Sequence, residues 1–112
     1  MSDDADNAMK LLEELKKGLV PFGKLTTYKS VGKVLAIRPR EVGAACRTLG
    51  LQPKTKRLPY HRVICQDGWL PSSFSAGGRE RHIKLLEREG HKVEQVEEGY
   101  IVLDFKDCLQ EP

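Results

Sequence analysis

The stretch from residue 58 to 64 constrains this chain most, because it sets an aromatic hydroxyl, an imidazole and a guanidinium side by side next to an apolar run. Tyr60-His61-Arg62 follow a leucine and a proline, and the β-branched pair Val63-Ile64 then runs toward Asp67-Gly68, a dipeptide that favours tight turns. The pattern predicts a short buried strand with polar groups fixed at its start. A lone triplet of this kind also fits a half-buried tyrosine and a hydrogen-bonded core histidine. The surrounding sequence therefore has to decide between the two interpretations.

Length and cysteine content limit the class of protein. The 112 residues predict one domain, residues 1–112, with a core from about residue 5 to 104. No apolar run approaches the roughly 20 residues that span a bilayer, and the acidic start lacks the layout of a secretory signal, so we expect no membrane association. Cys46, Cys65 and Cys108 are widely spaced and lack a Cys-x-x-Cys pair. This spacing argues against a disulfide framework and a four-ligand zinc site, and we expect no metal, no cofactor and a reducing compartment.

Basic residues are concentrated in the middle third of the chain, although the net charge is only +3. Residues 24–62 hold ten Lys or Arg and one acid, Glu41, whereas the rest of the chain holds nine basic and fifteen acidic residues. A solvated lysine-rich surface would explain part of this excess. A local surplus of nine positive charges exceeds what solubility requires, and it favours a phosphate-bearing partner such as a nucleic acid.

Apolar spacing predicts three helices in the first half of the chain. The first covers about residues 4–18, where apolar residues recur at helical intervals: Ala8, Leu11, Leu12, Leu15 and Leu19. Pro21-Phe22-Gly23 then breaks the chain, and Thr26 or Thr27 can cap a second helix that runs to about residue 35. A third helix begins near residue 40, after a proline. A helix, a tight turn and a helix within the basic third form the outline of a helix-turn-helix.

The third predicted helix has an unusually smooth surface. Val42 and Leu49 supply a buried stripe, whereas Gly43, Ala44 and Ala45 leave little side chain beyond the backbone. A helix that reads bases in the major groove carries long polar side chains, whereas a smooth helix can bring its backbone close to sugars and phosphates. The pattern therefore favours close approach to DNA and counts against the alternative of a helix-turn-helix transcription regulator. Small residues also permit tight helix packing, which would explain the same stripe without DNA.

The second half of the chain predicts loops, one helix and a hairpin. A basic loop covers residues 52–57, and a loop rich in serine and glycine covers residues 71–78. Residues 79–89 are typical of a helix that ends at Gly90. Residues 93–96 and 100–103 flank Glu97-Glu98-Gly99 and predict a hairpin, and residues 108–112 predict a frayed tail. The expected fold is α+β and mainly helical.

Several motifs, in the right order, resemble the O6-alkylguanine-DNA alkyltransferases. Pro59-Tyr60-His61-Arg62-Val63 resembles that family's Pro-Cys-His-Arg-Val motif, with Tyr60 where the family has its alkyl-accepting cysteine. Residues 21–28 are similar to the family's Pro-x-Gly-x-Val-x-Thr-Tyr entry to the helix-turn-helix, and residues 40–45 to its Arg-x-Val-Gly-x-Ala recognition helix. Ser75-Ala76-Gly77 and Glu89-Gly90 match its closing loop and late acid. The resemblance covers about residues 15–103 and implies a single winged helix-turn-helix-like domain of the alkyltransferase C-terminal type.

Members of this family without the cysteine form the alkyltransferase-like proteins, so the resemblance implies a protein that binds alkylated DNA without repairing it. It implies binding to duplex DNA through the minor groove and rotation of O6-alkylguanine into a pocket, where the held lesion marks the site for nucleotide excision repair. The expected partners are DNA containing O6-alkylguanine and nucleotide excision repair proteins. We expect a monomer, cytoplasmic in a prokaryote and nuclear in a eukaryote.

The resemblance also implies which residues form the site. Arg40 would enter the duplex as a finger, Tyr28 would crowd the target phosphate, and Tyr60 would offer its ring to the alkyl group and its hydroxyl to the base. His61 and Glu89 would be structural remnants of the relay that activates the missing thiol. The full DNA-binding set is Thr27, Tyr28, Arg40, Gly43, Ala44 and Arg47, and the full lesion-pocket set is Tyr60, Arg62, Val63, Cys65 and Ser75.

Chemistry independently argues against alkyl transfer. A thiol of pKa about 8.5 is readily converted to thiolate by a neighbouring histidine, whereas a phenol of pKa about 10 stays protonated and is a poor nucleophile toward saturated carbon. Cys65 is the alternative nucleophile, but five positions along an extended strand measure roughly 17 Å. We therefore expect no catalytic residue, and an active transferase using Cys65 is the alternative enzyme interpretation.

Overall fold

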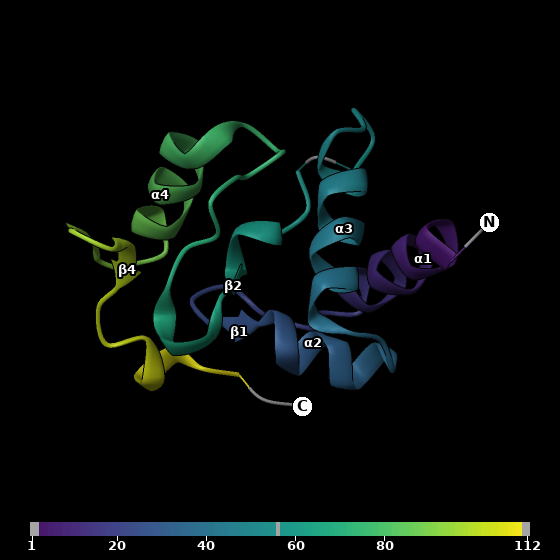
Figure 1. The fold of residues 1–112 in the computed structure, drawn as a ribbon, viewed down its shortest axis with the longest axis horizontal. Helices are drawn as coiled ribbons and strands as arrows, with labels where there is room; N and C mark the ends of the chain where they lie inside the picture. The colour runs from purple at the N-terminus through teal and green to yellow at the C-terminus, as the bar shows by residue number, and fades with distance from the viewer. Residues whose placement is uncertain (1–2, 56, 111–112) are drawn as a thin grey trace.

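Three helices form one side of the molecule (Figure 1). In the computed structural model, which describes residues 3–55 and 57–110, α1 spans Asp3–Lys16, α2 spans Tyr28–Leu35 and α3 spans Pro39–Gly50. Helix α1 packs along α3, and α2 contacts both. Leu11 and Leu15 of α1, Val31 of α2 and Val42 of α3 are buried together in the main core. The three helices predicted from apolar spacing are confirmed.

Local chemistry sets the boundaries of α2 and α3. Thr27 caps α2, because its side-chain oxygen accepts a hydrogen bond from the Ser30 N–H at 3.1 Å. The helix ends at Ala36, which adopts a left-handed conformation with φ of 60°. Pro39 occupies the first turn of α3, where the N–H that proline lacks would have no partner within the helix. Helix, tight turn and helix follow one another as the sequence predicts.

Two very short strands connect the Tyr60-His61-Arg62 triplet to the helices. Strand β1 (Thr26–Thr27) pairs in parallel with β2 (Val63–Ile64), with residue 26 opposite 63 and residue 27 opposite 64. Tyr60–Arg62 form a single 3-10 turn immediately before β2. Both residues of β2 are fully buried. The predicted buried strand is confirmed, but it is only two residues long.

A fourth helix and a hairpin form the other side of the molecule. Helix α4 spans Gly78–Arg88 and is followed by Gly90 with φ of 91°, which ends it as predicted. Strands β3 (Val93–Val96) and β4 (Gly99–Val102) pair antiparallel and confirm the predicted hairpin. The fold is therefore α+β and mainly helical. A second core joins the hairpin to α4 and β2, and its buried members are Leu25, Ile64, Leu70, Leu86 and Val102. Within residues 3–55 and 57–110, no helix has the length and apolar character needed to cross a membrane.

The prediction of a frayed tail is wrong for residues 108–110. The Leu25 N–H donates to the Cys108 carbonyl at 2.8 Å, and the Gln110 N–H donates to the Leu25 carbonyl at 2.6 Å. Leu25 is fully buried, and its backbone groups need partners that the two-residue strand β1 does not supply. The tail supplies them by pairing with Leu25. Glu111 and Pro112 of the predicted tail, and Lys56 of the predicted basic loop, lie outside the described residues.

Candidate functional site

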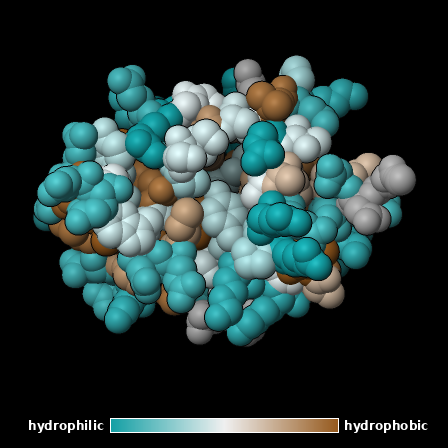
Figure 2. All heavy atoms as spheres, viewed as in Figure 1, coloured by the Kyte–Doolittle hydropathy of each residue, from teal (hydrophilic) through white to brown (hydrophobic). Residues whose placement is uncertain are grey.

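A pocket of about 360 Å³ lies between α3 and the loop at residues 71–75. Figure 2 shows the surface hollowed at this place, with hydrophilic side chains bordering it on the side of α3. The charged residues of its lining are Arg40 and Arg47, so the pocket carries positive charge. The complete lining is Tyr28, Pro39, Arg40, Gly43, Cys46, Arg47, Tyr60, Pro71, Ser72, Ser73, Phe74 and Ser75.

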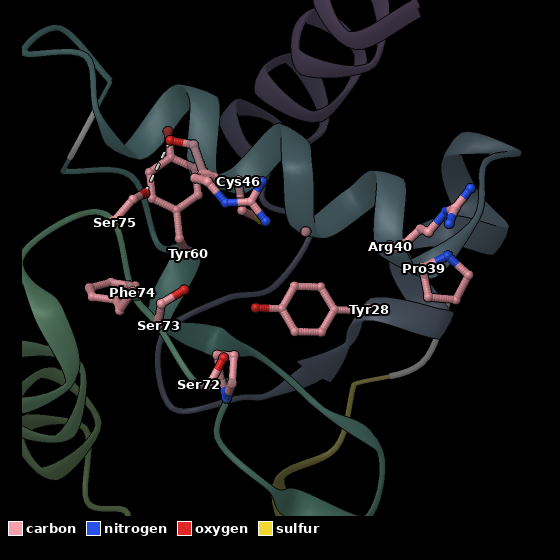
Figure 3. A pocket seen from close by; sticks show the side chains of 12 residues that line it. Tyr28, Pro39, Arg40, Cys46, Tyr60, Ser72, Ser73, Phe74 and Ser75 are labelled. Atoms are coloured by element: carbon pink, nitrogen blue, oxygen red, sulfur yellow. Dashed lines mark hydrogen bonds between the residues drawn. The ribbon is translucent and has the colours of Figure 1, made fainter.

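The smooth surface of α3 forms one wall of this pocket. Pro39, Gly43 and Cys46 are spaced by four and three residues, which places them on one face of the helix. A β-carbon at Gly43 would lie 4.0 Å from the Tyr28 ring, in ordinary van der Waals contact, so the ring lies next to this face of the helix. Figure 3 shows the Tyr28 hydroxyl directed into the pocket. Burial raises the pKa of Tyr28, with smaller contributions from the Cys46 and Cys65 thiols, so this hydroxyl keeps its proton.

Tyr60 forms a second wall, and its hydroxyl is already engaged. The residue is 3 % exposed, and its O–H donates to the Thr55 carbonyl at 2.6 Å. Thr55 is held in turn by a hydrogen bond from its own hydroxyl to the Leu49 carbonyl at 2.5 Å. Burial raises the pKa of Tyr60 to about 12. The expectation that this hydroxyl faces the base is therefore corrected, because it binds the loop after α3.

The loop at residues 71–75 closes the pocket opposite α3. The Ser75 hydroxyl donates to the Arg47 carbonyl at 3.1 Å, which fixes the loop to the helix (Figure 3). Phe74 stacks on the buried His82 ring, with 4.4 Å between ring centroids. Ser72 and Ser73 precede these two fixed residues and are exposed, so they present hydroxyls at the pocket mouth.

Arg62, Val63 and Cys65, expected in the lesion pocket, are not among the lining residues. The Arg62 Nε donates to both Glu89 oxygens, at 3.0 and 2.9 Å, and a terminal nitrogen of its guanidinium donates to the Val20 carbonyl at 3.0 Å. Val63 is fully buried in the core. Tyr60–Arg62 form a 3-10 turn, in which successive side chains point in different directions, so Tyr60 faces the pocket and Arg62 does not. The 17 Å separation expected between Tyr60 and Cys65 assumed an extended strand and does not apply.

Glu89 is the centre of a buried polar cluster beside the pocket. Its carboxylate pairs with His61 Nε2 at 2.5 Å and accepts the Gly23 N–H at 2.7 Å, in addition to the two bonds from Arg62. Burial alone would raise the pKa of Glu89, but hydrogen bonds from Gly23, His61 and Arg62 hold it below its ordinary value. Burial lowers the pKa of His61 despite the carboxylate beside it. Neither His61 nor Glu89 lines the pocket, and the cluster ties the end of α4 to the Tyr60-His61-Arg62 turn.

The other predicted DNA-binding residues fall into two groups. Arg40, Gly43 and Arg47 line the pocket together with Tyr28. Thr27 is buried as the cap of α2, and Ala44 is half-buried on α3 outside the lining. Their roles toward DNA stay predictions, because no nucleic acid is present in the structure.

Sequence reasoning missed Cys46 and most of the loop at residues 71–75. Cys46 lies three residues after Gly43, and this helical spacing would have placed it on the pocket face. Burial raises the pKa of its thiol to about 12, so it stays protonated. No pattern marks Pro71, Ser72, Ser73 or Phe74, because a loop without periodicity gives no indication of its direction. In the part of the chain that the structure describes, no group of three His, Cys, Asp or Glu side chains could hold a metal ion.

The second helix of the helix-turn-helix and a serine-rich loop enclose a positively charged pocket. This arrangement defines a DNA-binding domain of the alkyltransferase type. Residues 7–91 match the family described as 6-O-methylguanine DNA methyltransferase, DNA binding domain. The chain belongs to this family, as its motifs predict.

Within the family, the chain is an alkyltransferase-like relative. It is 30% identical over 95 residues to Alkyltransferase-like protein 1 of Schizosaccharomyces pombe, a match that covers 83% of this chain and 85% of that protein. A crystal structure of S. pombe Atl1 in complex with damaged DNA containing O6-carboxymethylguanine has a TM-score of 0.77 and 28% identity. That superposition covers 96% of this chain and 97% of the other.

Methyltransferases from archaea match over the same region. A methylated-DNA–protein-cysteine methyltransferase of Saccharolobus islandicus is 36% identical over 89 residues, which are 76% of this chain and 51% of that enzyme. The structure of the O6-methylguanine-DNA methyltransferase of Pyrococcus kodakaraensis has a TM-score of 0.59 and 35% identity, covering 74% of this chain and 45% of the enzyme. The chain thus spans about half the length of these enzymes.

Proposed function

We propose that this protein recognises O6-alkylguanine in duplex DNA and holds the base without accepting its alkyl group. The observation that carries this proposal is the position of Tyr60 in the pocket wall, within a motif where the resemblance expects the acceptor cysteine. A phenol with a pKa of about 12, whose proton is donated to the Thr55 carbonyl, supplies almost no phenolate near neutral pH. The pocket therefore suits binding and lacks the nucleophile for transfer.

The smooth face of α3 and Arg40 provide the means of binding. The absence of long side chains at Gly43 and Ala44 lets the helix approach the minor groove closely. Arg40 is exposed at the start of α3 and lines the pocket mouth, so its guanidinium can occupy the place that a rotated base leaves. Removing a base from the stack costs a few kcal/mol, less for a damaged pair, and contacts of the base in a pocket of 360 Å³ offset that cost. The complex of S. pombe Atl1 with damaged DNA supports the binding of damaged DNA.

A protein that holds a lesion without changing it must pass the lesion to another repair system. We assign that step to nucleotide excision repair, whose proteins would meet a persistently occupied site. The protein would act as a monomer, in the nucleus of a eukaryote or the cytoplasm of a prokaryote. Its direct partner is duplex DNA containing O6-alkylguanine.

An active transferase using a cysteine is the competing function. Two thiols lie at or near the pocket, and burial raises the pKa of both, to about 12 for Cys46 and above its usual value for Cys65. A thiol of raised pKa holds less thiolate at neutral pH and attacks carbon more slowly. Both thiols are therefore less suited to alkyl transfer than an activated acceptor cysteine.

One experiment separates these functions. Fluorescence titration would compare a duplex carrying a single O6-methylguanine with the same duplex carrying guanine, and intact mass spectrometry would follow the protein afterwards. We expect tighter binding to the lesion and an unchanged protein mass. Equal affinity for the two duplexes would refute lesion recognition. A stoichiometric gain of one methyl group, mapped to Cys46, Cys65 or Cys108, would establish transfer, and a preference for base sequence independent of the lesion would indicate a regulator.

A further inference from the structure

A second concavity lies at the turn between α2 and α3, and we call it the basic groove. It measures about 500 Å³ and shares Pro39 with the lesion pocket, so the two lie on either side of the start of α3. In Figure 2, hydrophilic side chains also gather over α2. The lining residues of the basic groove are Lys29, Gly32, Lys33, Ala36, Ile37, Arg38, Pro39 and Glu41.

Three exposed cations surround the basic groove, Lys29, Lys33 and Arg38. None of them forms an ion pair with any residue in 3–55 or 57–110. The one acid in the lining, Glu41, uses its Oε1 to accept the Arg38 N–H at 2.9 Å and so caps the start of α3. The groove therefore holds three positive charges against the single negative charge of Glu41 and keeps a net positive charge.

The arrangement of these cations is unfavourable without an anion. Lys29 and Lys33 are four residues apart on one face of α2, and like charges at this spacing destabilise a helix. Arg38 adds a third positive charge to the same concavity. An anion in the groove would remove this repulsion.

The backbone of the turn holds the groove in shape. The Ile37 N–H donates to the Gly32 carbonyl at 2.9 Å, and a β-carbon at Gly32 would lie 2.6 Å from the Ile37 carbonyl oxygen. Only glycine permits so close a return of the chain. The turn therefore fixes Arg38 beside the two lysines before any ligand arrives, and a charged ligand meets a preformed site.

We propose that the basic groove binds a phosphodiester of the DNA backbone next to the nucleotides that the lesion pocket and Arg40 engage. This inference rests on the proposed function, because it assumes that α3 lies against duplex DNA. A phosphate held on the other side of Pro39 gives the duplex a second anchor while Arg40 enters it. The contact is to the backbone, so it strengthens binding to damaged and undamaged duplex alike.

The first test is the salt dependence of binding. The variant Lys29→Gln/Lys33→Gln/Arg38→Gln is compared with a variant of equal charge change far from the turn, in which Lys10, Lys84 and Lys92, all exposed, become Gln. We expect the groove variant to reduce the slope of log K against log salt by about 1 for each phosphate that it no longer neutralises, on both duplexes. The control should keep the wild-type slope. Equal slope changes in the two variants would overturn the proposal, since net charge alone would explain them.

The second test locates the phosphate by neutralising the DNA backbone. Neutral methylphosphonate linkages are placed one at a time along the O6-methylguanine duplex, and binding of the wild-type protein and of the groove variant is measured. We expect one flanking position at which neutralisation weakens wild-type binding but leaves the groove variant unaffected, and a scan without such a position would overturn the proposal. Should the triple variant fail to fold in a thermal melt, the single change Arg38→Gln, outside the helices, replaces it. Failure of the proposed function appears separately, as the loss of lesion preference in the wild-type protein.

Discussion

Replacing Tyr60 by Phe or Ala separates the two roles of this side chain. Tyr60→Phe keeps the ring that lines the pocket and removes only the hydroxyl that donates to the Thr55 carbonyl at 2.6 Å. Net contributions of such hydrogen bonds are about 0.5–1.5 kcal/mol, so the free energy of unfolding should fall by about 1 kcal/mol. Because the hydroxyl is engaged by the Thr55 carbonyl, preference for O6-methylguanine over guanine should remain as in the wild type.

Tyr60→Ala removes the wall itself. Truncating a buried aromatic side chain costs about 3–5 kcal/mol of stability, because a cavity replaces its packing contacts. The alkyl group of the lesion also loses its contact with the apolar ring, which contributes about 1–3 kcal/mol to the free energy of binding. The ratio of affinities for the damaged and plain duplexes should therefore fall by about 5- to 150-fold. Binding to the plain duplex should change little, since backbone contacts come from other residues.

Urea denaturation gives the stability of each variant, and fluorescence titration gives both affinities at a temperature where the alanine variant is folded. The ratio of the two affinities is the decisive quantity, because partial unfolding lowers both equally. A phenylalanine variant without lesion preference would mean that the hydroxyl reaches the base and that the bond to Thr55 breaks on binding. An alanine variant with unchanged preference would place the alkyl group elsewhere and refute this account of the pocket.

Four further substitutions test other parts of the molecule. Arg40→Ala should weaken binding to the lesion duplex at least about tenfold, with less effect on binding to the plain duplex. Lys54→Ala should weaken binding to the two duplexes equally and reduce the slope of log K against log salt by about 1. Equal losses of affinity and equal slope changes in the two variants would argue against base rotation. Glu89→Gln should lower the free energy of unfolding by about 3 kcal/mol, because it leaves the half-buried Arg62 without its carboxylate; a shift below about 1 kcal/mol in urea denaturation would contradict this. His82, with its pKa lowered by burial to about 4 from 6.5, resists protonation only in the folded state, so its stability contribution is complete above pH 6.5 and declines as pH falls toward 4. The decline should reach about 2 kcal/mol at pH 5, and in His82→Gln the drop in unfolding free energy between pH 7 and pH 5 should be smaller by that amount.

The elements and the family could be predicted because their signals are local. The apolar spacing of Leu11 and Leu15, the cap at Thr27 and the stop at Gly90 each depend on a few neighbouring residues, and the structure has all of them. The Tyr60-His61-Arg62 triplet likewise identified the alkyltransferase family from adjacent residues.

The direction of individual polar side chains could not be predicted in this way. Arg62 turns from the pocket because Glu89, 27 residues later, returns to meet it at the end of α4. The Tyr60 hydroxyl binds Thr55 because the loop after α3 folds back beneath the ring. Cys108 pairs with Leu25 across most of the chain. Each contact depends on tertiary packing, and no local pattern in the sequence indicates it.

The charge distribution also determines which face can meet DNA. The hairpin formed by β3 and β4 lies on the opposite side of the molecule from α3 (Figure 1), and Glu94, Glu97 and Glu98 are exposed on it and at its turn. Carboxylates close to phosphates would repel the duplex, so the hairpin is an unfavourable place for a second DNA contact. Residues 24–62, with ten basic residues and one acid, supply both the pocket face of α3 and the basic groove. Under the proposed function, this charge difference would orient the protein before contact, with Arg40 facing the duplex and the acidic hairpin directed away from it.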